Sequence, residues 1–468
     1  MVFSSLVFLY VFLPVLFLLY FSFKHTGYRN WILIIASFLF YAWGEPVWVS
    51  LLAVSALIAY MSGLWIDKYR GTDRSKLILA LSVSINLLML IFFKYVGFLV
   101  DTVSDLLRMD IPYNDPGLPI GISFFTFQAI SYLIDVYRGD LEAKRSPVKL
   151  LLYLSLFPQL IAGPIVRYTD IEKEIDNRRV TLFGFNEGIT RFLIGLGKKV
   201  IFANMVGEGA TLFLDGDLGE LSVMGAWLGI TLFALQIYFD FSGYCDMAIG
   251  LGKMFGFTFP ENFKYPYISL SASDFWRRWN LTLGSFFRDY VYIPLGGNRR
   301  FYIRNLFVVW FLTGLWHGAS WNFIFWGLYF GVLIYVERMF LLRLLNKLPR
   351  IVSHAYLVLM MLLGWVLFYF TDLERAIDFF QTLFGLGTGG LYNLEAWLYI
   401  KDNLYLIAAA AIGSTPIARV AVSWLFKRTA QGSAVRNLVV SAFNLLILVV
   451  CTALLVGSTY NPFLYFRF

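Results

Sequence analysis

Two residues combine a chemically useful side chain with an apolar setting: His317 and Asn280. His317 lies within an almost wholly apolar stretch from Asn305 to Tyr335. An ionisable side chain at membrane depth is costly to bury and by default marks a functional site. An imidazole can take a proton from a hydroxyl and return it to a leaving group, and an amide can donate to a developing oxyanion. The pair would suit acyl transfer. The alternative is a histidine that hydrogen-bonds between helices and stabilises their packing.

A group of arginines near Asn280 in the sequence could bind an anionic substrate. Its members are Arg277, Arg278, Arg288, Arg299 and Arg300. A guanidinium recognises phosphate by its charge and its rigid fork of donors, so a phosphorylated donor such as coenzyme A would fit. The alternative is the general excess of basic residues on the cytoplasmic side of membrane proteins. The sequence has no metal-ligand cluster and no Gly-rich phosphate loop, and we predict no bound metal.

The composition indicates a membrane protein. Of 468 residues, 59% are hydrophobic, 19% are aromatic and only 15% are charged. Several apolar runs approach or exceed the roughly 20 residues that a helix needs to cross a bilayer. The clearest runs are 2–23, 47–66, 77–93, 223–239, 356–370 and 438–456. The polar intervals between the runs are too short for a separate core, which predicts a single integral-membrane domain over residues 1–468.

The net charge of +8 does not indicate nucleic-acid binding, because Lys and Arg collect in the cytoplasmic loops of membrane proteins. Basic loops, such as 138–149, alternate with acidic ones, such as 101–115. The alternation predicts about ten crossings, with the N-terminus on the outer face. Two or three further segments are expected to enter the membrane without clearly crossing it.

Two of these segments are interrupted apolar stretches. The stretch 150–165 contains Pro158 and Pro164 and has basic loops on both sides, which predicts a re-entrant element. The stretch 301–336 also begins and ends among basic residues. It is expected to be a helical hairpin or a broken helix, with His317 near the break. Irregular backbone survives in a membrane only where protein or a water-filled cavity surrounds it.

The stretch 269–300 is amphipathic instead of uniformly apolar. A helix over this stretch would start at Ser271 or Ser273 as its cap. It would place Asn280 on a stripe with Trp276 and Leu283, beside a polar stripe. An amide on such a buried face needs hydrogen-bond partners. Two carboxylates elsewhere, Asp240 and Asp246, are expected to pair with the arginines of this helix or to face a cavity.

Six motifs carry a resemblance to a known family. The longest are DFWRRWNLTLGSFFRDYVYIPLGGNR (274–299) and LTGLWHGASWNFIFWGLYFG (312–331). Shorter ones are IYFDFSGYCDMAIG (237–250), FPQLIAGPIVRY (157–168), ISFFTFQAISYLIDVYRG (122–139) and the ending NPFLYFRF. In these motifs the sequence resembles the membrane-bound O-acyltransferase family, in the bacterial branch that acetylates exported polysaccharides.

The resemblance implies an all-α ring of about 10–12 transmembrane helices, with re-entrant and interfacial helices, around a central tunnel. It places the catalytic base at His317. Many relatives have a second histidine where this chain has Asn280, and other members use asparagine there. We further expect two sets of site residues. Donor-binding residues would be Arg277, Arg278, Arg288 and Trp276; tunnel-lining residues would be Trp316, Trp279, Asp289, Asn322 and Gln128.

The implied function is transfer of an acetyl group from a cytoplasmic thioester, such as acetyl-CoA, across a bacterial inner membrane. The final acceptor would be an exported or cell-surface polysaccharide such as alginate, cellulose or a wall polymer. No permanently bound cofactor and no nucleic acid are expected. The expected partners are membrane lipid and a separate extracytoplasmic acetyltransferase of the SGNH serine-hydrolase type. Two alternatives are D-alanyl transfer to teichoic acid from a carrier protein and a non-enzymatic transporter.

Overall fold

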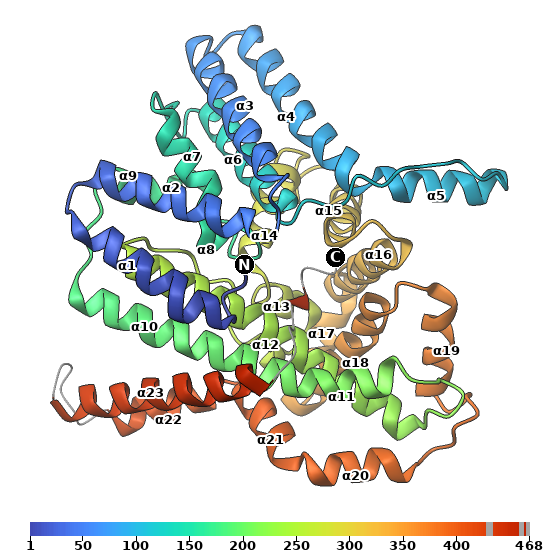
Figure 1. The fold of residues 1–468 in the computed structure, drawn as a ribbon. Coiled ribbons are helices and arrows are strands. Elements are labelled where there is room, and N and C mark those ends of the chain that lie inside the picture. The colour runs from blue at the N-terminus through green and yellow to red at the C-terminus, as the bar shows by residue number, and fades with distance from the viewer. Residues whose placement is uncertain (427–433, 458–462, 465–468) are drawn as a thin grey trace. The chain divides into compact units, whose positions relative to one another are not determined.

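The computed structural model describes residues 1–426, 434–457, 463 and 464, and the regular elements in these residues are all helices (Figure 1). This confirms the predicted all-α class. The chain forms two compact units, one of residues 1–192 and 247–260 and one of residues 193–246 and 261–468. Compactness alone does not show which parts fold independently, so the single domain over residues 1–468 stays a prediction.

Among the described residues, five helices are long and apolar enough to cross a membrane. They are α3 (Val49–Lys68), α4 (Asp73–Lys94), α12 (Val223–Phe255), α18 (Arg350–Tyr369) and α23 (Ala434–Gly457). The pair α21 (Leu404–Gly413) and α22 (Ile417–Leu425), bent by 76°, could form a sixth span. The predicted total of about ten crossings would require shorter helices to cross as well, and it stays a prediction.

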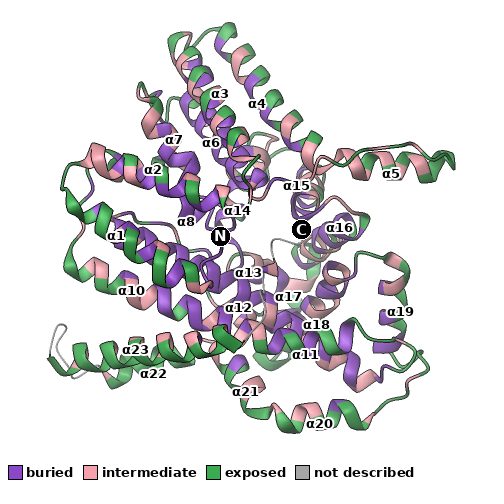
Figure 2. Ribbon diagram, in the orientation of Figure 1, coloured by how far each residue is buried: buried purple, intermediate pink, exposed green. Residues whose placement is uncertain are grey.

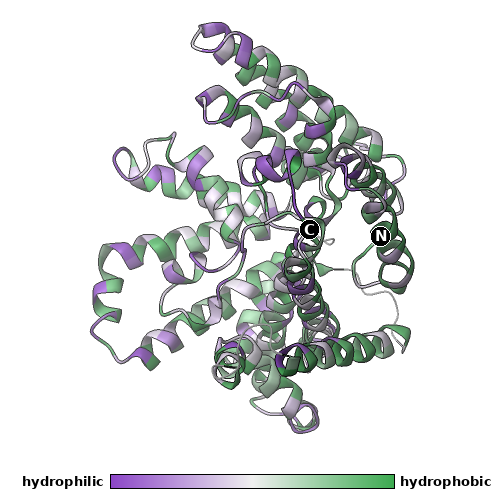
Figure 3. Cartoon of the chain, turned by 90° about the vertical axis from the view of Figure 1, so that its left-hand side faces the viewer, coloured by the Kyte–Doolittle hydropathy of each residue, from purple (hydrophilic) through white to green (hydrophobic). Residues whose placement is uncertain are grey.

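These helices expose apolar side chains, as a lipid environment requires. In the most apolar 18-residue segment of α23 only 6% of the residues are buried, whereas 67% are buried in the corresponding segment of α12. Figure 2 shows α4 and α23 mostly exposed along their length. Hydrophobic residues nevertheless dominate the helices, and hydrophilic ones gather in loops and at helix ends (Figure 3). An exposed apolar surface this large on the helices indicates contact with lipid tails. The chain is therefore a polytopic membrane protein.

The first unit contains most of the N-terminal helices. Besides α3 and α4 they are η1 (Phe8–Phe12), α1 (Leu13–Ser22), α2 (Thr26–Ala42), α5 (Val96–Leu107), α6 (Ile122–Arg138), α7 (Pro147–Ser155), α8 (Phe157–Leu160), α9 (Tyr168–Asp176) and the start of α10 (Leu182–Gly197). The predicted interruption in 150–165 is confirmed, because α7 ends at Ser155 and α8 starts at Phe157. Whether this element is re-entrant stays a prediction.

Small residues allow α3 and α6 to pack closely in the first unit. Ser55, Ala59 and Gly63 of α3 are buried, and a side chain at Gly63 would come within 2.8 Å of the ring of Tyr132 on α6. Small residues at helix interfaces let backbones approach and gain van der Waals contact, which is the main attraction between helices in lipid.

The second unit begins with the end of α10. It contains η2 (Lys198–Ala203), α11 (Asn204–Leu214), residues 223–246 of α12, η3 (Pro266–Ile268), α13 (Ala272–Trp276), α14 (Leu281–Phe287), η4 (Arg288–Tyr292), α15 (Tyr302–His317), α16 (Trp321–Val336), η5 (Glu337–Leu341), α17 (Leu342–Leu345), α18, α19 (Leu373–Leu383), α20 (Leu394–Asp402), α21, α22 and α23.

The hairpin of α15 and α16 is the element that holds His317. The two helices lie side by side (Figure 1) and are joined by three residues, so the predicted hairpin is confirmed. Glycines set their separation: a side chain at Gly314 would meet the Phe323 carbonyl oxygen at 2.3 Å, and one at Gly327 would meet the Trp310 carbonyl oxygen at 2.3 Å.

Candidate active site

His317 is the last residue of α15, at the point where the hairpin turns. It is 5% exposed. Aromatic rings surround the imidazole edge to face: the ring centroids of Trp316 and Trp326 lie 4.9 Å away, and that of Phe368 lies 5.1 Å away. Offset and edge-on contacts of this kind hold a ring in one orientation. The imidazole is therefore fixed, and mostly removed from water, at the turn of the hairpin.

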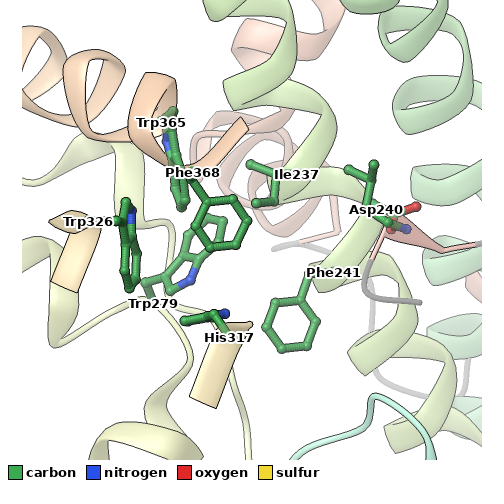
Figure 4. Close-up of a pocket in the computed structure, with 9 residues that line it drawn as sticks. Ile237, Asp240, Phe241, Trp279, His317, Trp326, Trp365 and Phe368 are labelled. Carbon is green, nitrogen blue, oxygen red and sulfur yellow. Dashed lines mark hydrogen bonds between the residues drawn. The ribbon is translucent and has the colours of Figure 1, made fainter. Parts of the chain in front are cut away.

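A cavity of about 20 Å³ adjoins the imidazole, which is room for about one water molecule. Figure 4 shows Trp326, Trp365 and Phe368 on one side of it and α12 residues on the other. The described residues that line it are Ile237, Asp240, Phe241, Trp279, His317, Trp326, Trp365, Phe368 and Leu464. His317 and Asp240 are the two ionisable groups in this lining, so the wall is otherwise made of apolar and aromatic side chains.

Asp240 is committed to structural contacts. Its Oδ1 pairs with the Lys199 ammonium at 2.5 Å, and its Oδ2 accepts a hydrogen bond from the Leu464 backbone N–H at 2.8 Å. Asp246, further along α12, pairs with Lys198 at 2.7 Å. The cavity position expected as one alternative is confirmed for Asp240, whereas the pairs are formed with lysines instead of the expected arginines. Both lysines come from η2.

The predicted continuous helix over 269–300 is wrong. Ser271 does cap a helix start, accepting from the Asp274 N–H at 3.1 Å, but α13 ends at Trp276 and α14 starts only at Leu281. Asn280 lies in the turn between them, with φ of 46°. Its side chain is buried, and its Nδ2 has no hydrogen-bond partner among the described residues. The described residues therefore leave this donor unused.

The structure brings Trp279 to the His317 cavity, although Asn280, the next residue, is not part of the lining. The expected donor-binding arginines lie on the surface of the second unit. Arg278 pairs with Asp274 at 3.1 Å, and Arg288 pairs with Asp289 at 2.6 Å. The carboxylates lower the net positive charge that these arginines offer to an anion. Their role in donor binding, and that of the exposed Arg277, stays a prediction.

The remaining expected site residues occupy different places. Trp316 is buried against His317. Trp276 belongs to an aromatic group and packs on Trp326 with ring centroids 5.4 Å apart. Asn322 is buried, and its Nδ2 donates to the Leu367 carbonyl at 3.1 Å. Gln128 is buried on α6, in the first unit. Their proposed roles as donor-binding or tunnel-lining residues stay predictions.

Much of the cavity wall carries no signal in the sequence. Phe241, Trp326, Trp365 and Phe368 are aromatic residues in apolar helices, and the same residue types are common on lipid-facing surfaces. Leu464 comes from the C-terminal segment, far from His317 in the sequence. Besides His317 and Trp279, Asp240 was distinctive, because a carboxylate within an apolar run calls for a partner.

The arrangement suits proton transfer in a dry pocket. A fixed imidazole faces a space that admits a very small group, and apolar walls strengthen electrostatic interactions within it. A histidine in such a place can act as a general base towards a hydroxyl.

Comparison with known proteins identifies the class. The membrane-bound O-acyltransferase family matches residues 35–373. The chain is 37% identical to a probable alginate O-acetylase of Pseudomonas putida over 100% of both chains. It is 41% identical to a probable alginate O-acetylase of Pseudomonas aeruginosa over 84% of this chain and 77% of that one. It is also 32% identical to a peptidoglycan O-acetyltransferase of Helicobacter pylori over 100% of this chain and 98% of that one.

The all-helical membrane fold, the buried histidine and these matches define an integral-membrane acyltransferase. The chain belongs to the membrane-bound O-acyltransferase family. The resemblance seen in the sequence is confirmed, as is the prediction of an enzyme, and the transporter alternative falls away.

Proposed function

We propose that this enzyme takes an acetyl group from acetyl-CoA on the cytoplasmic side and passes it across the inner membrane, for O-acetylation of an exported or cell-surface polysaccharide. The observation that supports this most strongly is the cavity beside His317. Its lining is apolar and aromatic apart from His317 and Asp240, which suits an uncharged acyl group. The relatives named as acetylases of alginate and of peptidoglycan favour the same acyl group and this class of acceptor.

The proposed reaction uses His317 as the base. Its imidazole takes the proton of an acceptor hydroxyl while the hydroxyl oxygen attacks the thioester carbonyl. A tetrahedral oxyanion forms, and the Asn280 amide is the proposed donor to it. When the oxyanion collapses, the carbon–sulfur bond breaks and the imidazolium returns its proton to the thiolate. The products are an oxygen ester and free coenzyme A, and the enzyme is unchanged.

D-alanyl transfer fits the cavity less well. A D-alanyl group carries an ammonium, and an apolar wall cannot solvate it. Asp240 is the carboxylate in the wall, and both of its oxygens are already engaged by Lys199 and Leu464. An uncharged acetyl group needs no such partner. The lining therefore favours acetyl over D-alanyl.

The proposed topology puts the N-terminus on the outer face. It puts the exposed Arg277 and Arg288 and the half-buried Arg278 at the cytoplasmic entrance for the donor. The membrane lipid surrounds the spans. The acyl group leaves on the outer side, where a separate SGNH-type acetyltransferase completes the transfer to alginate, cellulose or another wall polymer. Polysaccharide and partner enzyme are thus the proposed interaction partners beyond the donor.

His317→Ala tests the proposal. We expect the variant to reach the membrane in normal amount and to lose at least about 100-fold in acetyl transfer, because general acid–base catalysis contributes about 10²–10⁴-fold. The assay is release of free coenzyme A from acetyl-CoA by protein in proteoliposomes, together with polymer acetylation in cells. His25→Ala, which changes an exposed histidine that caps α2, is the matched control.

Two results would contradict the proposal. Retained acetylation in the His317 variant would remove this imidazole from the chemistry. Binding of an aminoacyl carrier protein but not of acetyl-CoA by the wild-type enzyme would replace the proposed donor with the D-alanyl one.

A further inference from the structure

The turn between α13 and α14 must be held in place by contacts from outside the turn. It carries Trp279, a wall of the His317 cavity, and Asn280, the proposed oxyanion donor. Asn280 has left-handed backbone geometry, which L-residues other than glycine rarely adopt and which persists where surrounding contacts enforce it. The helices on either side have five and seven residues, too short to be stable alone.

Glu337 holds the start of α13. It is the first residue of η5, follows α16 directly, and is 0% exposed. Its Oε1 accepts from the Ala272 N–H at 2.7 Å and from the Tyr356 hydroxyl at 3.1 Å. Its Oε2 accepts from the Ser273 N–H at 2.8 Å and from the Ser273 hydroxyl at 2.6 Å. The carboxylate thus joins α13 to α16 and to α18, the helices that supply Trp326, Trp365 and Phe368.

Asn262 holds the start of α14 from the other side. It is buried, and its backbone carbonyl accepts from the Leu281 N–H at 3.1 Å. Its Oδ1 accepts from the Thr282 N–H at 3.0 Å and from the Thr282 hydroxyl at 2.9 Å. Its Nδ2 contacts the Cys245 sulfur of α12 at 3.4 Å. The turn is therefore fixed at both ends, once to the hairpin and once to α12.

We infer that Glu337 and Asn262 are positioning residues of the active site, which set the distance of Trp279 and Asn280 from His317. Neither touches the cavity. Glu337 acts through the backbone of α13, and Asn262 acts through the backbone of α14. The expected effect on catalysis rests on the proposed function. The claim that the two residues hold the turn in place depends only on the geometry of the turn.

The four contacts of the Glu337 carboxylate all come from donors, so only an acceptor fits there. In Glu337→Gln the side chain keeps its shape but presents an NH₂ group to at least one N–H or O–H. Two buried donors that face each other both lack an acceptor, so the side chain is expected to move away from this position. The start of α13 would then shift and carry Trp279 and Trp276 with it. Trp276 packs on Trp326, so both sides of the cavity wall would move.

The test compares Glu337→Gln with the wild-type enzyme in nanodiscs. We expect kcat for coenzyme A release from acetyl-CoA to fall at least about 10-fold, because misplacement by 1 Å can cost about 100-fold. KM for acetyl-CoA should rise as well, because the shift of α13 also moves Trp276, Arg277 and Arg278, three of the proposed donor-binding residues. The near-ultraviolet circular dichroism of the tryptophans should change as well. Asn262→Ala should give the same pattern, and it serves as the second variant should Glu337→Gln not fold.

Two control variants separate positioning from general destabilisation. Ser273→Ala leaves both backbone N–H contacts to Glu337 in place and should stay within about threefold of wild-type kcat. Asp372→Asn alters a carboxylate that caps α19 in the same unit, where Oδ1 accepts from the Glu374 N–H at 2.9 Å. It should leave kcat and the tryptophan spectrum unchanged.

The outcomes distinguish this inference from the proposed function. Wild-type kcat together with a wild-type spectrum in Glu337→Gln would overturn the positioning role while the proposed function stands. A wild-type enzyme that never cleaves acetyl-CoA would overturn the proposed function. The spectra of Glu337→Gln and Asn262→Ala would then decide the structural part: a tryptophan change supports it, and its absence overturns it.

Discussion

Removing one member of the Lys199–Asp240 pair should destabilise the enzyme far more than removing both. Each side chain of the pair is 3% exposed, so neither charge can recover its hydration when its partner is lost. Breaking a buried ion pair costs about 3–5 kcal/mol, whereas removing both charges is often neutral. Lys199→Met leaves the Asp240 carboxylate buried without its counter-charge, and we expect the variant to lose stability in that range.

Adding Asp240→Asn to Lys199→Met should restore most of the loss. The asparagine keeps the shape of the aspartate and can still accept from the Leu464 N–H. The remaining deficit is the unsatisfied NH₂ of the new amide, about 1–3 kcal/mol. Because the cavity keeps its volume and His317 is untouched, the double variant should retain acetyl transfer.

The measurement is unfolding by SDS in mixed micelles, followed by tryptophan fluorescence, for the wild type, both single variants and the double variant. The expected order of stability is wild type, double variant, then the single variants. A double variant whose loss equals the sum of the single losses would refute the pairing argument. A folded double variant with no activity would show instead that the Asp240 charge takes part in the reaction.

Two shorter predictions concern the packing of the hairpin and the wall of the cavity. Gly327→Ala should abolish folding or assembly in the membrane, because the added methyl would lie 2.3 Å from the Trp310 carbonyl oxygen. Gly457→Ala is the control, because no atom of the described residues lies within 4 Å of the added methyl there. Equal expression of both variants would count against close packing of the hairpin. Leu464→Ala should enlarge the cavity beside His317. We expect kcat/KM for propionyl-CoA to rise relative to that for acetyl-CoA by about 10-fold, the effect of one methylene in an apolar pocket. An unchanged ratio of the two kcat/KM values would exclude Leu464 as a determinant of acyl size.

The hairpin could be predicted because its signals are local. Between Leu312 and Gly331 the apolar pattern is interrupted by glycines and a histidine within a few residues, and a short break of this kind favours a turn. The placement of His317 at the end of α15 followed from the same stretch. Long spans such as α3, α4 and α18 were equally visible, because apolar runs of that length are typical of membrane-spanning helices.

The turn at Asn280 could not be predicted, because its cause is distant in the sequence. The spacing of Trp276, Asn280 and Leu283 is compatible with one helix. At the break, the Leu281 and Thr282 N–H groups bond to Asn262 instead of to a preceding helical turn, while Glu337 binds the first N–H groups of α13. Tertiary contacts of this kind override a local pattern, and neither Asn262 nor Glu337 stands out in its own stretch of sequence.

The same turn gives a physical reason why a chain without a second histidine could still offer a donor to the proposed reaction. On a continuous helix, the backbone N–H groups near position 280 would be used within the helix, and the side chain would follow the direction of its neighbours. Breaking the helix at Asn280 frees the orientation of the amide from the helix axis, at a cost in backbone strain of about 1–3 kcal/mol. The anchors at Glu337 and Asn262 offset that strain with buried hydrogen bonds. An asparagine tolerates left-handed geometry better than most residues, so at this position the residue type meets a backbone requirement as well as a chemical one.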